Sequence, residues 1–449
     1  MKMATKADYQ VALALRLERR PDAALPHILA VRRAEPENID GMLLHGQLLV
    51  ELYRFEEAVA IYRAALALAP DRYQVVTHLG VALFELDQFD EALALLRQAF
   101  AMAPQNARVI ANLGHFLDFA GSVDLAISAY EAALSVVPND REILVNYGMA
   151  LLRAGRLAEG WALFETRLRI PDPIETSGVP HLPPLTATPD LSGRRILLFH
   201  EQGFGDTLQM LRYIPLLAAH GAEIVLRMPP ALKRLAARVG GTLADDTGVT
   251  GYDFYCPMMS LPMVFGTVLE TIPAEIPYLN APEAEGETWR RRLAALPGPR
   301  IGLVWAGSPR GGLDRRRSMR FDRLAPLFAL PASFVSLQLG EAGRGWAPPP
   351  GTAALDPTGE LVDFADTAAL VSALDLVITV DTSVAHLAGA LGKPVWVLSR
   401  FSSCWRWLMG RADSPWYPTM RIFRQRLPGD WAGLIAEVEE ALRERLAAG

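Results

Sequence analysis

The stretch ITVDTSVAHLAGALGKPVWVL, residues 378–398, decides the fold of the second half of this chain. An apolar run ends at Asp381, small residues with helical spacing follow, and a second apolar run comes after Gly-Lys-Pro. Strand, helix and strand in this order are typical of a parallel sheet. Ligands of open parallel sheets bind beyond the carboxyl ends of the strands, so we expect Asp381, Thr382 and Ser383 to line a binding site.

The helix start in this stretch is predicted to receive a phosphate. Asp381 can cap a helix that begins near Thr382. The free N–H groups of Thr382, Ser383 and Val384 then point outward at the positive end of the helix dipole, where an anion is stabilised without a metal. A capping acid alone is common, so other segments must support this interpretation.

The same alternation of short apolar runs and helix-like segments continues on both sides of this stretch. We predict strands at residues 196–200, 223–227, 253–256, 301–305, 334–339, 376–380, 395–398 and 421–423. The first three and the last five are predicted to form two parallel sheets, divided by the polar stretch 283–299. Residues 431–447 are amphipathic and are predicted to close the chain as a helix.

Polar residues also follow the first predicted strand, in HEQGFGD, residues 200–206. Gly203 and Gly205 allow a tight turn with close backbone approach to a ligand. If the second sheet faces this one across a cleft, Asp206, Glu201 and His200 become candidate general bases. The alternative for Asp206 is a simple helix cap.

The loop GSPRGGLDRRRS, residues 307–318, follows the fourth predicted strand. Its arginines can bind the same phosphate from the neighbouring strand, because guanidinium groups pair with phosphate through two hydrogen bonds. The alternative is a solvated basic loop. The candidate contacts in this loop are Ser308, Arg310, Arg315, Arg316 and Arg317.

The first part of the chain carries an internal repeat of 34 residues. Three residue types keep this period: Pro36, Pro70, Pro104 and Pro138; Ala24, Ala58, Ala92 and Ala126; Gly46, Gly80, Gly114 and Gly148. The pattern resembles the tetratricopeptide repeat, a helix–turn–helix unit. We therefore expect a helical solenoid with atypical terminal units.

A solenoid of this kind presents a concave groove, usually to a peptide or another protein. The sixth position of successive units is predicted to face the groove and holds His78, Asn112 and Asn146. A side-chain amide can donate to one backbone carbonyl and accept from one N–H, so two such residues can hold an extended chain. Alternatively, Asn112 and Asn146 bond to the neighbouring helix.

Six prolines between residues 170 and 193 exclude a continuous helix and indicate a semi-rigid linker. The predicted domains are a repeat solenoid at 1–169, a linker at 170–193, a first α/β lobe at 194–298 and a second at 299–449. The fold class is α + α/β, with a pair of Rossmann-type lobes of which the first is short. The net charge of −6 argues against a nucleic-acid partner.

Several classes of site and location are predicted to be absent. Cys256 and Cys404 are far apart without a CxxC motif, and no D-x-D motif occurs, so neither a zinc site nor a metal-bridged diphosphate is expected. Neither a signal peptide nor an apolar run of membrane-spanning length is visible. We expect a cytoplasmic protein, with docking to a membrane surface left open.

Four segments resemble glycosyltransferases of the GT-B fold and the heptosyltransferase type, family 9: HEQGFGDTLQMLRYIP, GLVWAGSP…DRRRS, DFADTAALVSALDLVITVDTSVAHLAGALGKPVW and SPWYPTMRIFRQ. The resemblance implies transfer of a sugar from a nucleotide-sugar donor with inversion, without a metal or another cofactor. It implies that Asp206 is the base near the acceptor. It also implies that Asp381, Thr382, Ser383 and His386 bind the donor diphosphate, with Arg315 and Arg317 neutralising its charge.

Three hypotheses about function follow. In the first, the repeats recruit a protein that receives the sugar, as in the protein O-GlcNAc transferases, which join similar repeats to a GT-B domain. In the second, the acceptor is a glycolipid or polysaccharide. In the third, the protein is an inactive scaffold, although the joint presence of Asp206, the arginines and Asp381-Thr382-Ser383 argues against it.

Overall fold

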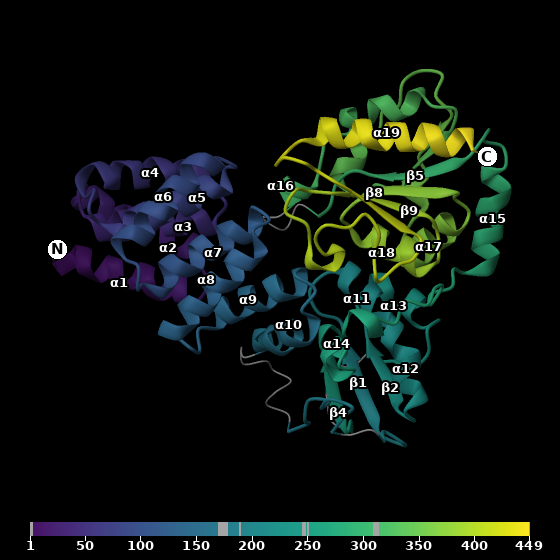
Figure 1. The fold of residues 1–449 in the computed structure, drawn as a ribbon, viewed down its shortest axis with the longest axis horizontal. Helices are drawn as coiled ribbons and strands as arrows, with labels where there is room; N and C mark the ends of the chain where they lie inside the picture. Colours follow the sequence, from purple (N-terminus) through teal and green to yellow (C-terminus); the bar gives the residue numbers. More distant parts are fainter. Residues whose placement is uncertain are drawn as a thin grey trace. The chain divides into compact units, whose positions relative to one another are not determined.

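The computed structural model describes residues 3–168, 178–187, 190–244, 248, 251–308 and 314–448. The chain divides into two compact units, residues 1–150 and 151–449 (Figure 1). The division falls inside helix α9 (Arg141–Arg153), before the predicted solenoid end at residue 169.

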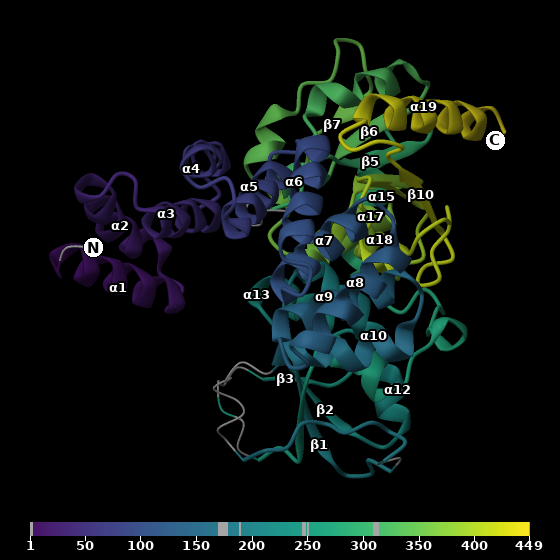
Figure 2. The same ribbon diagram turned by 60° about the vertical axis from the view of Figure 1, so that its left-hand side comes forward.

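The first unit is a succession of paired antiparallel helices, which confirms the predicted solenoid (Figure 2). The repeated glycines let the helices of a pair approach closely: a Cβ added at Gly46 would lie 2.4 Å from the ring of Tyr62. The helices that precede α9 are α1 (Met3–Leu17), α2 (Pro21–Ala34), α3 (Ile39–Glu51), α4 (Phe55–Leu68), α5 (Tyr73–Glu85), α6 (Phe89–Met102), α7 (Ala107–Phe119) and α8 (Val123–Val136).

The second unit begins with the last repeat helix, α10 (Leu157–Phe164), and the short helix η1 (Glu165–Leu168). Trp161 of α10 is buried; its Nε1 donates to the Thr267 carbonyl at 3.1 Å and its ring packs edge-on against Trp405 at 5.1 Å. These contacts join α10 to the α/β region, which explains why the unit begins before residue 169.

The first sheet of this unit is parallel, in the order β3-β2-β1-β4. Its strands are β1 (Arg195–Phe199), β2 (Glu223–Arg227), β3 (Thr242–Leu243) and β4 (Phe254–Pro257). The described part of the predicted linker pairs with the outer edge of β4, where Leu182 N donates to the Tyr255 carbonyl at 2.8 Å. The helices of this lobe are α11 (Phe204–Met210), α12 (Ile214–Ala219), α13 (Pro230–Ala236) and α14 (Leu261–Val264).

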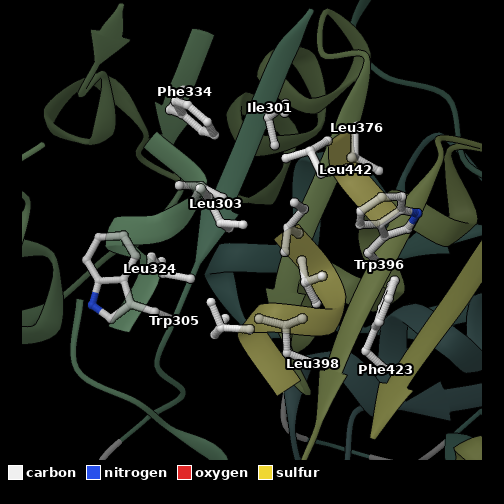
Figure 3. Close-up of a cluster of buried hydrophobic side chains, with 14 of the residues drawn as sticks. Ile301, Leu303, Trp305, Leu324, Phe334, Leu376, Trp396, Leu398, Phe423 and Leu442 are labelled. Atoms are coloured by element: carbon white, nitrogen blue, oxygen red, sulfur yellow. The ribbon is translucent and has the colours of Figure 1, made fainter. Parts of the chain in front are cut away.

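The second sheet is also parallel, in the order β10-β9-β8-β5-β6-β7. Its strands are β5 (Arg300–Val304), β6 (Ser333–Ser336), β7 (Ala354–Leu355), β8 (Leu376–Val380), β9 (Val395–Ser399) and β10 (Met420–Arg424). Figure 3 shows one face of this sheet, where Leu303, Leu376 and Trp396 pack with Leu442. Leu442 belongs to α19 (Trp431–Ala447), so the predicted closing helix covers this face together with η6 (Phe321–Ala329).

Helices α17 (Phe364–Ser372) and α18 (Ser383–Ala390) lie on the other side of the second sheet, as Figure 1 shows. Helix α15 (Glu283–Leu293) packs against α17. All eight predicted strands are present within a few residues of their predicted bounds. The strands that sequence reasoning missed, β3 and β7, have two residues each, too few to form an apolar pattern.

Candidate functional site

The starts of α11 in the first lobe and α18 in the second lie against each other. A Cβ added at Gly205 would lie 2.8 Å from Cδ2 of His386 and 3.3 Å from Cα of Ser383. Gly205 therefore permits the close approach of two helices, and its predicted approach to a ligand stays a prediction. The contact brings the turn that contains Asp206 next to the segment that follows β8.

Both carboxylate oxygens of Asp206 have partners. Oδ2 accepts from the backbone N–H of Gly203 at 2.8 Å, and Oδ1 accepts from Nη2 of Arg406, a residue of the second lobe. Arg406 also donates to Oε1 of Gln209 at 3.1 Å and lies over the ring of Trp405. Burial alone would lower the pKa of the Arg406 guanidinium, but the charge of Asp206 together with Cys404 and Asp381 outweighs it, so the pKa is raised.

His386 lies inside the same contact and is 4% exposed. Its Nδ1 is 2.9 Å from the hydroxyl of Tyr417, and its ring stacks on Trp407 at 5.1 Å. Burial, followed by the charges of Arg406 and Arg212, lowers the pKa of His386 well below its ordinary value. The ring is therefore neutral at physiological pH and can offer one N–H donor.

A second contact between the lobes is centred on Arg212, which is 3% exposed. Its Nη1 donates to the Pro273 carbonyl at 2.9 Å and to the Trp416 carbonyl at 2.8 Å. Its guanidinium also lies over the rings of Tyr278, Trp416 and Tyr417, at 4.6 to 5.3 Å. The SPWYPT segment thus packs around a buried cation.

The start of α18 differs from the prediction in one respect. The N-cap residue is Thr382, not Asp381, and its side chain makes no capping hydrogen bond. The Thr382 hydroxyl instead pairs with the hydroxyl of Thr379 at 2.9 Å. Asp381 cannot cap the helix because the chain is still extended at Thr382, where φ is −136° and ψ is 173°. The first N–H groups of α18 consequently receive no side-chain cap.

Arg317 extends from α16 (Asp314–Arg317) toward the end of β8. Its Nε donates to Oδ1 of Asp314 at 3.2 Å, and its Nη1 lies 3.5 Å from the carbonyl oxygen of Asp381. A Cβ added at Gly307, just after β5, would lie 2.5 Å from the guanidinium of Arg317. The predicted meeting of the arginine segment with Asp381 is therefore present through Arg317.

The other candidates in this loop are placed differently. Arg315 and Ser308 are exposed. Arg310 lies outside the described residues.

A pocket of about 630 Å³ lies beyond β5 and β6, at the same edge of the sheet. Trp305, Phe321 and Phe328 supply an aromatic wall, and Asp322 and Glu341 supply carboxylates. This volume is in the usual range for a small-molecule site with a few polar groups. The sequence contained a signal for this pocket, since Glu341 follows the strand that ends nearby.

Glu201, another predicted candidate base, forms an ion pair with Arg167, and its role as a base stays a prediction. Its carboxylate accepts from Nη2 and Nε of Arg167 at 2.6 and 3.1 Å, and from Met259 N at 3.0 Å. Arg167 also donates to Glu165 at 2.5 Å and to Ser260 at 2.8 Å. Glu201 is thus part of a buried network that holds η1 against the first lobe.

His200 lies at the end of β1, with its Nδ1 2.7 Å from the hydroxyl of Thr207. Burial lowers the pKa of His200, although Asp206 and Glu201 oppose this shift. Gly203 is exposed and its N–H is taken by Asp206. These hydrogen bonds hold the turn together.

The first unit contains a pocket of about 330 Å³ between α5, α7 and α9. Asn112 and Asn146 both line it, together with Phe84, Phe116 and Glu142. Neither amide makes a hydrogen bond with any residue that the structure describes. His78 does not line this pocket: its ring stacks on Tyr62 at 5.6 Å and its Nε2 bonds to Gln47 at 2.8 Å.

Sequence reasoning missed Arg406, Tyr417 and Arg212, which surround Asp206 and His386. Arg212 and Tyr417 lie in segments that we quoted, and Arg406 lies between two of those segments. A single arginine or tyrosine in a sequence does not indicate which residue it pairs with. Trp405, Trp407 and Trp416 are buried against protein groups, whereas Trp305 lines the pocket.

Comparison with known families gives two kinds of match. Residues 9–73 and 111–173 match one tetratricopeptide repeat model, and residues 49–113 match another. Residues 360–418 match the model of glycosyltransferase family 9 (heptosyltransferase). The chain thus carries tetratricopeptide repeats, which indicate interaction with another protein, and a segment of a glycosyltransferase family. That segment contains α17, β8, α18, β9, Arg406 and Tyr417.

The chain is also similar to Protein FlbA of Caulobacter vibrioides, with 28% identity over 325 residues, 65% of this chain and 53% of that protein. The chain therefore spans about half the length of this relative. Similar solved structures include TTC0263, a thermophilic tetratricopeptide protein of Thermus thermophilus (TM-score 0.36, 20% identity, 38% of this chain, 94% of that chain). Another is MamA of Desulfovibrio magneticus RS-1 (TM-score 0.29, 21% identity, 38% of this chain, 94% of that chain).

Neither a metal-binding cluster nor a membrane-spanning helix is present among the residues that the structure describes. No group of three or more His, Cys, Asp or Glu side chains in these ranges is placed to hold a metal ion. None of the helices in these ranges combines the length and apolar character needed to cross a membrane.

Proposed function

We propose, from the union of tetratricopeptide repeats with a segment of glycosyltransferase family 9, that this chain transfers a sugar from a nucleotide-sugar to a protein bound by the repeats. The observation that carries the proposal is the contact between the start of α11, which holds Gly205 and Asp206, and the start of α18, which holds Ser383 and His386. The candidate base Asp206 and the candidate diphosphate site at the start of α18 therefore lie close together, between the two parallel sheets. Inactive scaffolds have no physical need for this arrangement.

The donor is proposed to lie across the carboxyl ends of the second sheet. The nucleoside occupies the pocket at β5 and β6, whose aromatic wall can stack on the base while Glu341 or Asp322 accepts from ribose hydroxyls. The diphosphate then reaches the end of β8, next to Arg317 and the uncapped start of α18. Guanidinium groups and helix N–H donors stabilise the charge that develops on the leaving diphosphate.

The transfer step is proposed to invert the sugar carbon. An acceptor hydroxyl oxygen attacks the anomeric carbon, the bond from that carbon to the phosphate oxygen breaks, and Asp206 takes the hydroxyl proton. The electron pair of the broken bond leaves with the nucleoside diphosphate. Arg406 holds the carboxylate of Asp206 in place, and neutral His386 can donate its remaining N–H to a phosphate oxygen.

A panel of nucleotide sugars tests this function. We expect at least one of them to raise the unfolding temperature of the full chain and to be slowly hydrolysed, and EDTA to leave the hydrolysis unchanged. Arg317→Gln is expected to weaken the binding of that nucleotide sugar about 10- to 100-fold, the usual value of a charge-assisted hydrogen bond. Arg323→Gln, an exposed arginine of η6 that does not line the pocket, serves as the control. If none of the panel binds, the glycosyltransferase function is wrong.

The repeats are proposed to bind an extended segment of the acceptor protein. Asn112 and Asn146 lie on successive repeats and line one pocket, and their amides can pair with backbone groups of a peptide. Recognition through the backbone suits a protein acceptor better than a glycolipid or a polysaccharide, which lacks a peptide backbone. If the acceptor is instead a glycolipid or a polysaccharide, the chemistry at Asp206 is the same, but the pocket at Asn112 and Asn146 has no assigned role.

Substitution of both amides tests the acceptor. Asn112→Ala with Asn146→Ala is expected to lower glycosylation of a protein acceptor at least about tenfold, through the loss of two or more hydrogen bonds, while hydrolysis of the donor stays unchanged. The readout is sugar incorporation into proteins of a lysate, separated from lipid by solvent extraction. Gln98→Ala, an exposed amide of α6 outside the pocket, is the control. Incorporation into lipid alone would establish the second hypothesis instead.

A further inference from the structure

Arg400 follows β9 directly, at the edge of the second sheet where the proposed site lies. The sheet register pairs Val380 with Leu398, and Ser399 with Arg424. Arg400 therefore comes off β9 beside the point where Asp381 and Thr382 come off β8. It belongs neither to the arginine loop nor to the stretch from which we predicted phosphate binding.

Within the ranges that the structure describes, the guanidinium of Arg400 has no hydrogen-bond or ion-pair partner. Its Nε and Nη1 atoms are buried without a hydrogen bond, and it forms no ion pair with any described residue. The residue as a whole is only partly buried, so it is accessible from one side. A buried cation without hydrogen bonds costs stability, and such a group in a native protein needs an explanation.

The surroundings of Arg400 make this cost larger. Burial lowers the pKa of Arg400, and the charges of Arg153 and Arg316 add to that effect, while Asp381 opposes it. Arg424, at the end of β10, also has a buried Nε without a partner, although its Nη2 donates to the Leu408 carbonyl at 2.9 Å. Arg153 and Arg316 therefore lie near Arg400, and Arg424 ends the adjacent strand. The carboxylate that offsets this positive charge is that of Asp381.

We propose that Arg400 binds the phosphate that carries the sugar in a nucleoside diphosphate donor, and that this anion is the missing counter-charge. The proposal rests on the proposed function. The strand order β9-β8-β5-β6 puts the nucleoside pocket at one end of the row and Arg400 at the other, with Arg317 and the start of α18 between them. A nucleotide sugar lying along this row has its base in the pocket at β5 and β6 and its sugar-bearing phosphate at Arg400.

The chemistry of the group fits a phosphate. A guanidinium offers planar pairs of N–H donors that match two oxygens of one phosphate, and its charge is permanent. Phosphate binding would satisfy the buried donors and offset the repulsion from Arg153 and Arg316. The N–H groups at the start of α18 would hold the other oxygens of the diphosphate.

Arg400→Met tests this proposal in the full chain, with Arg426→Met as the control. Arg426 lies two residues beyond Arg424, and its side chain is 80% exposed and paired with Glu437. Unfolding is followed by tryptophan fluorescence, because all nine tryptophans lie in the second unit. The probes are pyrophosphate, the common nucleoside diphosphates and the corresponding monophosphates.

Without ligand, Arg400→Met is expected to raise the unfolding temperature by about 2 °C or more, because it removes an uncompensated buried charge. It is expected to weaken diphosphate binding about 10- to 100-fold and to leave monophosphate binding unchanged. Arg400→Lys, which keeps the charge but loses the planar fork, is expected to weaken diphosphate binding without the rise in stability. Arg426→Met should behave as the natural chain does.

Equal diphosphate binding by the natural chain and by Arg400→Met would overturn the role of Arg400 while leaving the proposed function intact. A lower unfolding temperature for Arg400→Met without ligand would also overturn it, since the group would then stabilise the fold. Stabilisation by pyrophosphate that depends on Arg400, without stabilisation by any nucleotide, would support the anion site and contradict the proposed function. If no probe stabilises the chain, both are wrong.

Discussion

Asp206→Asn is expected to lower the rate of sugar transfer about 10²- to 10⁴-fold while the donor still binds, because an amide cannot take a proton from the acceptor. The asparagine keeps an oxygen for the N–H of Gly203, so the turn is preserved. Single-turnover transfer and donor-induced stabilisation, measured on the same samples, separate chemistry from binding.

Arg406→Met is the necessary comparison, because Asp206→Asn also removes the counter-charge of Arg406. The methionine variant keeps the carboxylate of Asp206 and removes only the cation beside it. Its transfer is expected to persist at a lower rate, because the group that takes the proton is still present. If Arg406→Met lost transfer as completely as Asp206→Asn while remaining folded, the ion pair, and not proton acceptance, would be the essential feature.

Arg167→Ala is expected to destabilise the second unit by about 3–5 kcal/mol, the usual cost of removing one partner from a buried ion pair. The side chain of Arg167 is 9% exposed, and its loss leaves the carboxylates of Glu165 and Glu201 buried without their cation. The measurement is urea unfolding followed by tryptophan fluorescence, which reports on this unit alone.

Two variants set the scale for this result. Arg156→Ala breaks an exposed pair with Glu159, whose side chains are 43% and 57% exposed, and is expected to cost at most about 1 kcal/mol. Glu201→Gln added to Arg167→Ala is expected to restore part of the lost stability, since the two sites are in contact. If Arg167→Ala cost no more than Arg156→Ala, the network would not hold Glu201, and Glu201 would again be a candidate base.

The solenoid and both parallel sheets could be predicted because their signals are local. The 34-residue spacing of glycine, alanine and proline, and apolar runs such as residues 376–380, repeat within one element and need no knowledge of what packs against it. The placement of Asp381 and Asp206 at strand ends followed from the same rule. The N-cap of α18 was predicted wrongly, because local chemistry allows either Asp381 or Thr382 at that position.

The partners of the site residues were decided by tertiary structure. Asp206 and Arg406 are 200 positions apart, and Glu201 meets an arginine 34 positions earlier that belongs to the last repeat. Whether a carboxylate serves as a base or as part of a buried network depends on which cation lies beside it, and spacing along the chain carries no record of that. By itself the sequence determined which elements form and which polar groups end the strands. Only the packing of the two lobes decided which of those groups are neutralised, and it left the guanidinium of Arg400 without a partner among the residues that the structure describes.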